Sequence, residues 1–374
     1  MDFSIHVEER TIFKRLDLNF ILVIFALNVI GLINLYSATH GPHSRDVEPL
    51  FISQFVWLGI GWSVFFVCTL LDYAIVARLA IWVFILNFGA LLYTTFFGTV
   101  ALGAQRWIDL GFFRYQPSET MKLALIMLMA KILATRNSAG AGMGLKELAV
   151  PMIVLLVPFG LVVEQPDLGT GMMLAAIGGS MILFTKVKKW ILALVITLVV
   201  VTVPVAWQFG LRDYQKNRIL TFIDPTNDRR GTGYNSIQSK IAVGSGRFLG
   251  KGFRKGTQSQ LEFLPERHTD FIYSVLSEEH GFVGSMMTMG LFCMLFILGL
   301  RIAMNARDKF GALLSVGVLC YVFWHMFVNI GMVIGLLPIV GVPLPLLSYG
   351  GSSMLTTMAG LGLISSVAYR RYLF

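Results

Sequence analysis

Ten long apolar stretches dominate the sequence, and they leave few folds open to it. A helix needs about 20 apolar residues to cross the hydrocarbon core of a bilayer. Apolar residues make up 56% of the 374 residues and charged residues 14%, against roughly 45–50% and about 25% in soluble domains. We therefore expect an all-α integral membrane protein with about ten transmembrane helices. The expected spans are residues 20–38, 52–71, 79–97, 119–135, 148–163, 168–185, 190–209, 272–300, 311–335 and 351–369.

The short loops indicate the orientation of these spans. With a cytoplasmic N-terminus, the inner segments carry fifteen Lys or Arg residues and the short outer loops carry three. Basic residues concentrate on the cytoplasmic side of membrane proteins. The sequence therefore predicts that both termini are cytoplasmic. It also predicts one polytopic membrane domain over residues 1–374, with a large extracytoplasmic loop at 210–271.

That large loop is basic and rich in glycine. It holds eleven basic and six acidic residues, a net charge of +5, which suggests an anionic partner such as a lipid phosphate. Glycine lets backbone N–H groups approach a phosphate closely. A glycine-rich re-entrant bend, or simply a solvated basic surface, would explain the pattern too. The glycines are Gly231, Gly233, Gly244, Gly246, Gly250, Gly252 and Gly256, and the interspersed cations are Lys240, Arg247, Lys251, Arg254 and Lys255.

The end of the loop, residues 261–271, packs three acids, an Arg and a His directly before a span. An acid at the membrane boundary can serve as a general base or bind a divalent cation. The alternative is that Thr269 or Asp270 only caps the next helix. A helix N-terminus would lower the pKa of Asp270 and favour metal binding over basicity.

Two ionisable residues lie near the start of the fourth span, where charges are costly and suggest function. Glu119 and Lys122 are three residues apart and share a helix face. Glu119 could line a cavity with Arg106, Trp107 and Arg114 from the preceding loop. A self-satisfied ion pair between Glu119 and Lys122 is the alternative.

Other polar residues lie in or beside spans. Pro166 breaks the chain between the fifth and sixth spans, and Asp167 heads the sixth, where capping alone would explain it. Glu278 and Glu279 lie two turns into the eighth span. His325 and Asn329 are expected to form helix–helix hydrogen bonds.

Residues 338–353 contain three prolines and three glycines. This composition excludes a regular helix and predicts a structured re-entrant segment. Non-helical backbone at that depth persists only where it is buried in protein or lines a cavity. Ser348 lies in this segment.

Together these segments resemble the SEDS family (shape, elongation, division and sporulation), in order and over essentially the whole chain. The resemblance is closer to its elongation member than to its division member. The motifs that carry it are Gly103–Ile108, Gln116–Glu119 with Lys122, Gln165–Thr170, Gly256–Gln260 running into Leu261–Phe271, and Pro343–Pro345 with Ser348–Ser352.

The resemblance implies a GT-C-like, ten-span peptidoglycan glycosyltransferase. Such an enzyme polymerises lipid II on the outer face of the bacterial cytoplasmic membrane and is paired with a class B penicillin-binding protein, a transpeptidase. The family's catalytic aspartate corresponds to Asp270 and its nearby acid to Glu262. The expected partners are lipid II, the growing glycan strand and membrane lipids, but no nucleic acid.

These inferences give one working hypothesis. Asp270 takes the proton of the acceptor hydroxyl, and basic residues, assisted by a divalent cation (Mg²⁺ or Mn²⁺), stabilise the leaving pyrophosphate. The sequence names no metal ligand. A lipid II flippase and a scaffold for the transpeptidase are the alternatives, together with a division-type polymerase. The expected substrate-binding residues are Arg106, Trp107, Glu119, Lys122, Asp167, Lys240, Arg247, Glu262 and Ser348.

Overall fold

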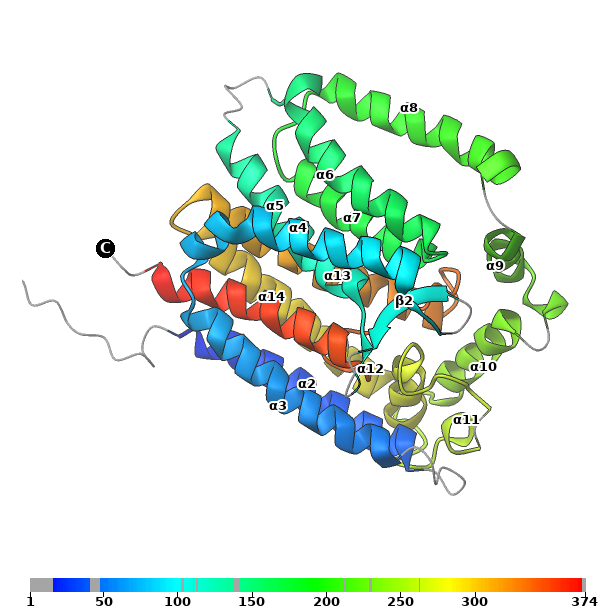
Figure 1. Cartoon of the computed structure of the whole chain (residues 1–374). Coiled ribbons are helices and arrows are strands. Elements are labelled where there is room, and N and C mark those ends of the chain that lie inside the picture. The colour runs from blue at the N-terminus through cyan, green and yellow to red at the C-terminus, as the bar shows by residue number, and fades with distance from the viewer. Residues whose placement is uncertain are drawn as a thin grey trace, which may run out of the picture.

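The computed structural model describes residues 16–40, 48–101, 104–109, 111, 114–136, 142–210, 213–228, 231–261 and 263–371. Helices occupy all ten predicted spans (Figure 1), so the all-α multi-pass architecture is confirmed. They are α2 (Leu18–Thr39), α3 (Glu48–Leu70), α4 (Tyr73–Phe97), α5 (Pro117–Thr135), α6 (Leu145–Glu164), α7 (Leu168–Leu183), α8 (Lys189–Val205), α12 (Ile272–Met304), α13 (Lys309–Val333) and α14 (Gly351–Arg370).

Seven of these helices are long and apolar enough to cross a membrane by themselves. The other three are α5, α7 and α8. Helix α5 carries Glu119, Lys122 and Lys131 within its 19 residues, while α7 and α8 have 16 and 17 residues. A short π-helical segment, η1 (Ala206–Gly210), continues α8.

The helices divide into a buried centre and an apolar surface. Of the apolar stretch of α14, 78% is buried, against 11% of that of α4. Large apolar side chains such as Trp82, Leu86 and Phe96 on α4 are at least 65% exposed. Apolar patches of this extent are unfavourable in water and suit contact with lipid. The buried helices α5, α13 and α14 thus form the interior of a membrane protein.

The predicted break at Pro166 is confirmed. Helix α6 ends at Glu164, and Asp167 caps α7 by accepting a hydrogen bond from the Thr170 N–H at 3.2 Å. The side-chain amide of Gln165 donates to the carbonyl of Leu91 at 2.9 Å. These contacts tie the break between two spans to helix α4.

Helix α12 contains a second break, which the sequence did not predict. Gly281 has φ 63° and ψ −157° within this helix, a conformation that only glycine adopts readily. The turn after α10 inserts there, because the N–H groups of Phe282 and Val283 donate to the carbonyls of Arg247 and Phe248 at 2.9 and 3.1 Å. The segment 210–271 is thereby joined to α12 by backbone hydrogen bonds.

The loop 210–271 is largely helical. It contains α9 (Asp213–Ile223), the 3₁₀ turn η2 (Pro225–Asn227), α10 (Thr232–Ser245) and the short α11 (Thr257–Gln260). A phosphate cradle from glycine N–H groups does not fit residues 232–245, because the Gly233 N–H donates to the Asp228 carboxylate at 3.3 Å and Gly244 lies inside the regular helix α10, where N–H groups bond within the helix. The alternative of a glycine-rich bend fits residues 246–252, which pack against the break in α12.

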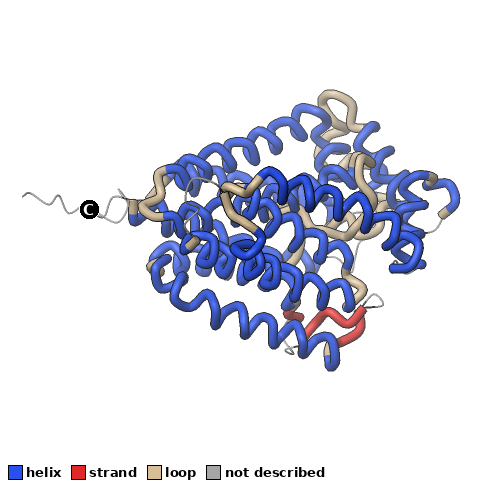
Figure 2. The backbone as a smooth tube through the Cα atoms, turned by 90° about the horizontal axis from the view of Figure 1, so that it is seen from above, coloured by secondary structure: helices blue, strands red, loops and turns tan. Residues whose placement is uncertain are grey.

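A small antiparallel sheet follows α4. Its strands are β1 (Thr99–Ala101), β2 (Ala104–Asp109) and β3 (Arg114–Tyr115), in the order β1-β2-β3. The sheet and α9–α11 lie at the end of the molecule opposite the C-terminus (Figures 1 and 2). Near that C-terminal end, Arg371 pairs with Asp17 before α2 at 3.6 Å. The polar elements thus gather at the opposite face from the described ends of the chain.

Residues 338–350 are non-helical, as predicted, but the prediction is wrong for the last three residues of the re-entrant segment, 351–353, because α14 begins at Gly351. Leu344, Leu346 and Leu347 of this segment are buried. At Gly31 of α2, a Cβ atom would lie 2.7 Å from the Leu346 carbonyl oxygen, so glycine permits the close contact. The re-entrant segment is therefore packed inside the protein.

Candidate functional site

Asp270 lies in the turn before α12 without capping that helix. The capping position is Phe271, and no side chain caps the helix N-terminus. The Thr269 hydroxyl instead donates to the carbonyl and carboxylate of Glu266 at 3.3 and 3.1 Å. The capping alternative is therefore wrong for Thr269 and Asp270.

The surroundings of Asp270 raise its pKa to about 7, chiefly through burial, with a further contribution from the Glu266 carboxylate. Arg218 on α9 opposes this rise. The expectation that a helix N-terminus lowers the pKa is wrong, because desolvation outweighs the helix dipole. A carboxyl group with a pKa near the working pH suits a general base.

The backbone of this turn is held by the re-entrant segment and α13. The Ser348 hydroxyl donates to the Thr269 carbonyl at 2.7 Å and accepts from the Leu344 N–H at 2.8 Å. The Asn329 side-chain amide donates to the carbonyls of Asp270 and Val342 at 2.8 and 2.7 Å. Asn329 thus joins two non-helical segments, so the predicted helix–helix bond is wrong for it.

Ser348 therefore influences Asp270 indirectly, by holding the backbone of the preceding residue, Thr269. Its hydroxyl is buried, and its two hydrogen-bond partners, the Leu344 N–H and the Thr269 carbonyl, are main-chain groups. The N–H of the next residue, Tyr349, donates to the His268 carbonyl at 2.9 Å. These contacts make Ser348 a residue that positions the Asp270 turn.

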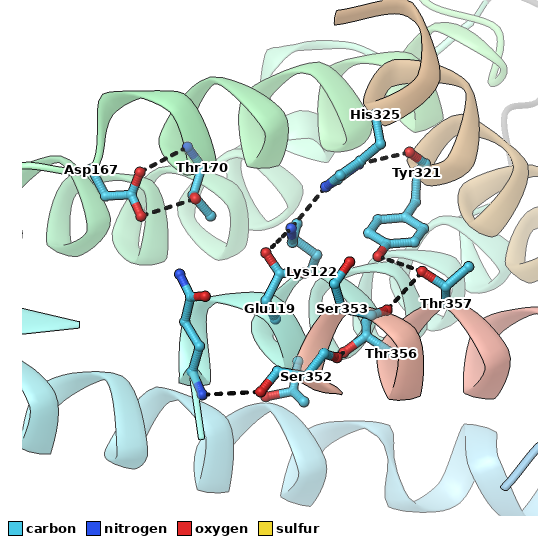
Figure 3. A network of polar contacts seen from close by, with 12 residues as sticks. Glu119, Lys122, Asp167, Thr170, Tyr321, His325, Ser352, Ser353, Thr356 and Thr357 are labelled. Atoms are coloured by element: carbon cyan, nitrogen blue, oxygen red, sulfur yellow. Dashed lines mark hydrogen bonds and ion pairs between the residues drawn. The ribbon is translucent and has the colours of Figure 1, made fainter. Parts of the chain in front are cut away.

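Deeper in the bundle, Glu119 and Lys122 form a buried polar network with α13 (Figure 3). The Lys122 ammonium donates to Glu119 Oε1 at 2.7 Å and to His325 Nε2 at 2.8 Å. It also lies 5.5 Å from the centre of the Tyr321 ring. The ion-pair alternative and the helix–helix bond of His325 are both confirmed. Glu119 Oε2 has no hydrogen-bond partner among the described residues.

Arg106 and Asp167 form a separate pair at the small sheet. The Arg106 guanidinium lies 3.5 Å from Asp167 Oδ2 and donates to the Pro166 carbonyl at 2.5 Å. Trp107 is half-buried, and Arg114 is exposed. Arg106 is thus engaged with the break between α6 and α7, whereas Glu119 pairs with Lys122.

The two predicted loop cations are both exposed. Lys240 extends along Gly335, where a Cβ atom would overlap the lysine chain. Arg247 has φ 50°, and its carbonyl accepts a hydrogen bond from the Phe282 N–H at the break in α12. Glu262 lies outside the described residues.

Glu278 forms more hydrogen bonds to the segment before α12 than the sequence indicated. Its carboxylate is fully buried and accepts from Lys251 Nζ at 2.7 Å and from the N–H groups of Gln258 and Ser259 at 3.0 and 3.3 Å. Only its place within an apolar span could have drawn attention to it. Its carboxylate therefore fixes α11 to α12.

The neighbouring Glu279 joins α12 to α2. Glu279 Oε1 accepts from the Ser37 hydroxyl at 2.6 Å, and Oε2 has no partner among the described residues. Within the described part of the chain, no three His, Cys, Asp or Glu side chains gather as a metal site. A metal ion at Asp270 would therefore need ligands from outside this set.

Fold and site together define a multi-pass membrane protein whose polar site lies toward one end of the helix bundle. A model of the family described as cell cycle protein FtsW/RodA/SpoVE matches residues 17–373. The chain belongs to this family, as the resemblance to SEDS proteins predicted.

Individual relatives agree with this assignment. The chain is 46% identical to peptidoglycan glycosyltransferase MrdB of Escherichia coli (strain K12) over 276 residues, 74% of each chain. It is 33% identical to the probable peptidoglycan glycosyltransferase FtsW of Geobacter metallireducens, over 99% of this chain and 98% of that one.

Solved structures share the fold. The RodA crystal structure of Thermus thermophilus, a rod shape determining protein, has a TM-score of 0.70 and 27% identity, covering 96% of this chain and 98% of that chain. A chain from a study of the structural coordination of polymerization and crosslinking by a peptidoglycan synthase complex has a TM-score of 0.82 and 28% identity, with coverage of 96% and 99%.

Proposed function

We propose that this chain polymerises lipid II into glycan strands at the outer face of the bacterial cytoplasmic membrane during cell elongation. It is a peptidoglycan glycosyltransferase of the RodA/MrdB type. The observation that carries the mechanism is Asp270, whose pKa is raised to about 7 in a turn held by Ser348 and Asn329.

In the proposed reaction, Asp270 is the general base. It accepts the proton of the acceptor hydroxyl while the hydroxyl oxygen attacks the anomeric carbon of the donor. The bond from that carbon to the pyrophosphate oxygen breaks, and undecaprenyl pyrophosphate leaves with the electron pair. A base with a pKa near neutrality combines a useful deprotonated fraction with sufficient basicity.

The leaving pyrophosphate needs positive charge nearby. The ammonium of Lys122 is buried and bound to Glu119 and His325, whereas Lys240 is exposed at the loop. Among the predicted cations, these contacts favour Lys240 as a phosphate ligand. They favour Lys122 as part of the framework behind the site.

A divalent cation is part of the proposal. Phosphate oxygens of the substrate and water would supply its ligands, since the described residues contain no cluster of three His, Cys, Asp or Glu side chains that could hold a metal ion. When bound, the cation neutralises charge on the pyrophosphate. Chelation by EDTA, followed by return of Mg²⁺ or Mn²⁺, tests this part.

The proposed setting places both termini in the cytoplasm and a class B penicillin-binding protein beside the outer ends of α12 and α13. The chain described as part of a peptidoglycan synthase complex and the described ends lying opposite the loop (Figure 1) support this arrangement. Accessibility of cysteines introduced beside Asp17 and Arg371 to a membrane-impermeant reagent checks the orientation.

The decisive experiment is lipid II polymerisation by purified full-length protein, with and without its transpeptidase. We expect glycan ladders from the wild type and none from a folded Asp270→Ala variant. No ladder from the wild type, even with partner and cation, would support a flippase or a scaffold. Ladders that persist in the variant would remove Asp270 from catalysis.

A further inference from the structure

The C-terminal end of α2 is capped by side chains from the segment that leads to α12. The last carbonyls of an α-helix have no partner within the helix, and here three donors from this segment reach them. The hydrogen bonds are Arg254 to the His40 carbonyl at 2.8 Å, Gln260 to that of Ser37 at 3.1 Å and Arg267 to that of Ala38 at 2.8 Å. Positive charge is favourable at a helix C-terminus, so the two arginines suit this position.

Arg267 belongs to the same turn as Asp270. The N–H groups of Thr269 and Phe271 both donate to the carbonyl of Glu266, at 3.1 and 3.3 Å, and these bonds close the turn. Arg267 is buried within the protein, with 7% of its surface exposed. Since the backbone closes this turn on itself, a shift of Arg267 would displace Asp270.

Helix α2 also holds the chain on the other side of Asp270. The side-chain amide of Asn34 donates to the Ile272 carbonyl at 2.8 Å. Arg267 lies three residues before Asp270 and Ile272 lies two residues after it, so α2 contacts the chain on both sides of the catalytic acid. The end of α2 is thus a third support of this turn, in addition to the re-entrant segment and α13.

The hydrogen bond of Arg267 comes from Nε, the nitrogen attached to Cδ. A glutamine side chain also carries an N–H donor on its Cδ, whereas methionine places a methyl group at the corresponding distance from the backbone. Substitutions at this position can therefore separate the hydrogen bond from the charge. Glutamine keeps the donor without the charge, and methionine removes both.

We propose that Arg267 positions Asp270 for proton transfer by anchoring the Asp270 turn to the C-terminal end of α2. This inference rests on the proposed function and adds a positioning residue that touches no reacting atom. Arg267 contacts the Ala38 carbonyl, and the closed turn transmits its position to the carboxylate. A general base must lie within about 3 Å of the oxygen whose proton it takes, so a small displacement of the turn would lower the rate.

The first test compares two variants of the full-length protein, Arg267→Met and Arg267→Gln, in lipid II polymerisation below their unfolding temperatures. Arg267→Met should lower kcat about 10- to 100-fold and leave KM nearly unchanged, because a displacement of about 1 Å can cost about 100-fold in rate. Arg267→Gln should recover most of this loss. An equal loss in Arg267→Gln would show that the charge is what matters, as in direct contact with a substrate phosphate, and would overturn the proposal.

Arg254→Met is the matched control. Arg254 donates a hydrogen bond of the same length to the same helix end, but it is exposed and lies sixteen residues before Asp270. Arg254→Met should therefore leave kcat close to that of the wild type. An equal fall of kcat in Arg254→Met and Arg267→Met would indicate a general loosening of the loop and would overturn the specific role of Arg267.

A further variant tests the proposal if Arg267→Met does not fold. Asn34→Leu removes the hydrogen bond between α2 and the Ile272 carbonyl while keeping a side chain of similar shape. Because Ile272 follows Asp270 by two residues, Asn34→Leu should also lower kcat with little change in KM. A kcat equal to that of the wild type would overturn the proposal that α2 positions Asp270.

The pH dependence of the rate separates positioning from a simple loss of charge. Burial is the main cause of the raised pKa of Asp270, and the charges that act on its carboxyl group are Glu266 and Arg218. A loosened turn would expose this group to water and lower its pKa, whereas loss of a nearby positive charge would raise it. The acidic limb of the pH–rate profile should therefore move to lower pH in Arg267→Met and return in Arg267→Gln. A limb that moves to higher pH in Arg267→Met would overturn the proposal.

The same assays distinguish a failure of this inference from a failure of the proposed function. Glycan ladders from the wild type, together with a normal kcat in Arg267→Met, would remove the positioning role and leave the proposed function in place. No ladders from the wild type, even with its transpeptidase, would overturn both.

Discussion

Two polar regions of this membrane protein contrast in how fully their charges are satisfied. Inside the bundle, Lys122 has two side-chain partners, Glu119 and His325, with both donor–acceptor distances below 3.0 Å. In the turn before α12, Asp270 is held through its carbonyl, and its carboxyl group has a raised pKa. The first region is organised to keep its charges paired, and the second to keep an acid available.

The difference has a physical reason. A buried charge without a partner is very unfavourable, so an ion pair within the membrane must be satisfied by its neighbours. A catalytic acid must instead keep its reactive oxygens free of strong donors and rely on its backbone for position. Ser348 and Asn329 provide that support from outside the carboxyl group.

The prediction with the largest expected effect tests the role of Asp270 as proton acceptor. Asp270→Asn should lower glycan polymerisation by about 10²- to 10⁴-fold, since it removes the proton acceptor, and should leave the thermal unfolding of the protein unchanged. Gel analysis of glycan products from a lipid II assay measures the loss. As a control, Asp109→Asn changes an exposed acid whose hydrogen bond to the Gly111 N–H at 2.9 Å an amide oxygen can also accept.

The second prediction tests the paired charges. Lys122→Met should destabilise the protein by about 3–5 kcal/mol, because it leaves Glu119 buried without its cation. Unfolding in detergent measures the change, and Glu119→Gln combined with Lys122→Met should recover most of the stability. If Lys122→Met keeps normal stability but loses turnover, Lys122 binds substrate and is not a structural residue.

The third prediction tests support through the backbone. Ser348→Ala should destabilise the protein by about 1–3 kcal/mol, because the Leu344 N–H and Thr269 carbonyl lose a buried partner. Polymerisation should fall as the Asp270 turn shifts, whereas Ser63→Ala, a change on the exposed face of α3, should have no effect. Ser348→Thr should restore part of the activity, and failure to do so would argue for a direct substrate contact by Ser348.

Much of this architecture was accessible from the sequence. The ten spans follow from apolar length, and the break at Pro166 follows from the chemistry of proline. The pairing of Glu119 with Lys122 follows from a spacing of three residues in a helix. In each case the signal is local, because the interacting residues are neighbours in the chain or repeat with the helical period.

The features that sequence reasoning missed depend on distant parts of the chain. The residues around Gly281 have a helical pattern, and only the turn carrying Arg247 opens the helix there. Arg106 pairs with Asp167 although two helices, α5 and α6, separate them in the sequence. The pKa of Asp270 was predicted with the wrong sign, because its burial is set by segments that are remote in sequence.

The smallest expected effect concerns pH and sharpens the comparison furthest. The Glu266 carboxylate contributes to the raised pKa of Asp270, so Glu266→Gln should lower that pKa. A general base works when deprotonated, so wild-type activity should fall as the pH drops through about 7. In the variant this fall should move to lower pH.

Arg218→Gln should move the acidic limb of the pH–rate profile to higher pH, because Arg218 lowers the pKa of Asp270. Rates of polymerisation between pH 5 and 9 at saturating lipid II measure both shifts, and Lys216→Gln is the control that keeps the wild-type profile. Opposite displacements are specific to a titrating carboxyl group between these two charges. If the role of Asp270 is only structural, both variants should have lower rates but the same pH dependence as the wild type. The proposal of Asp270 as the base is falsified if both variants give that result.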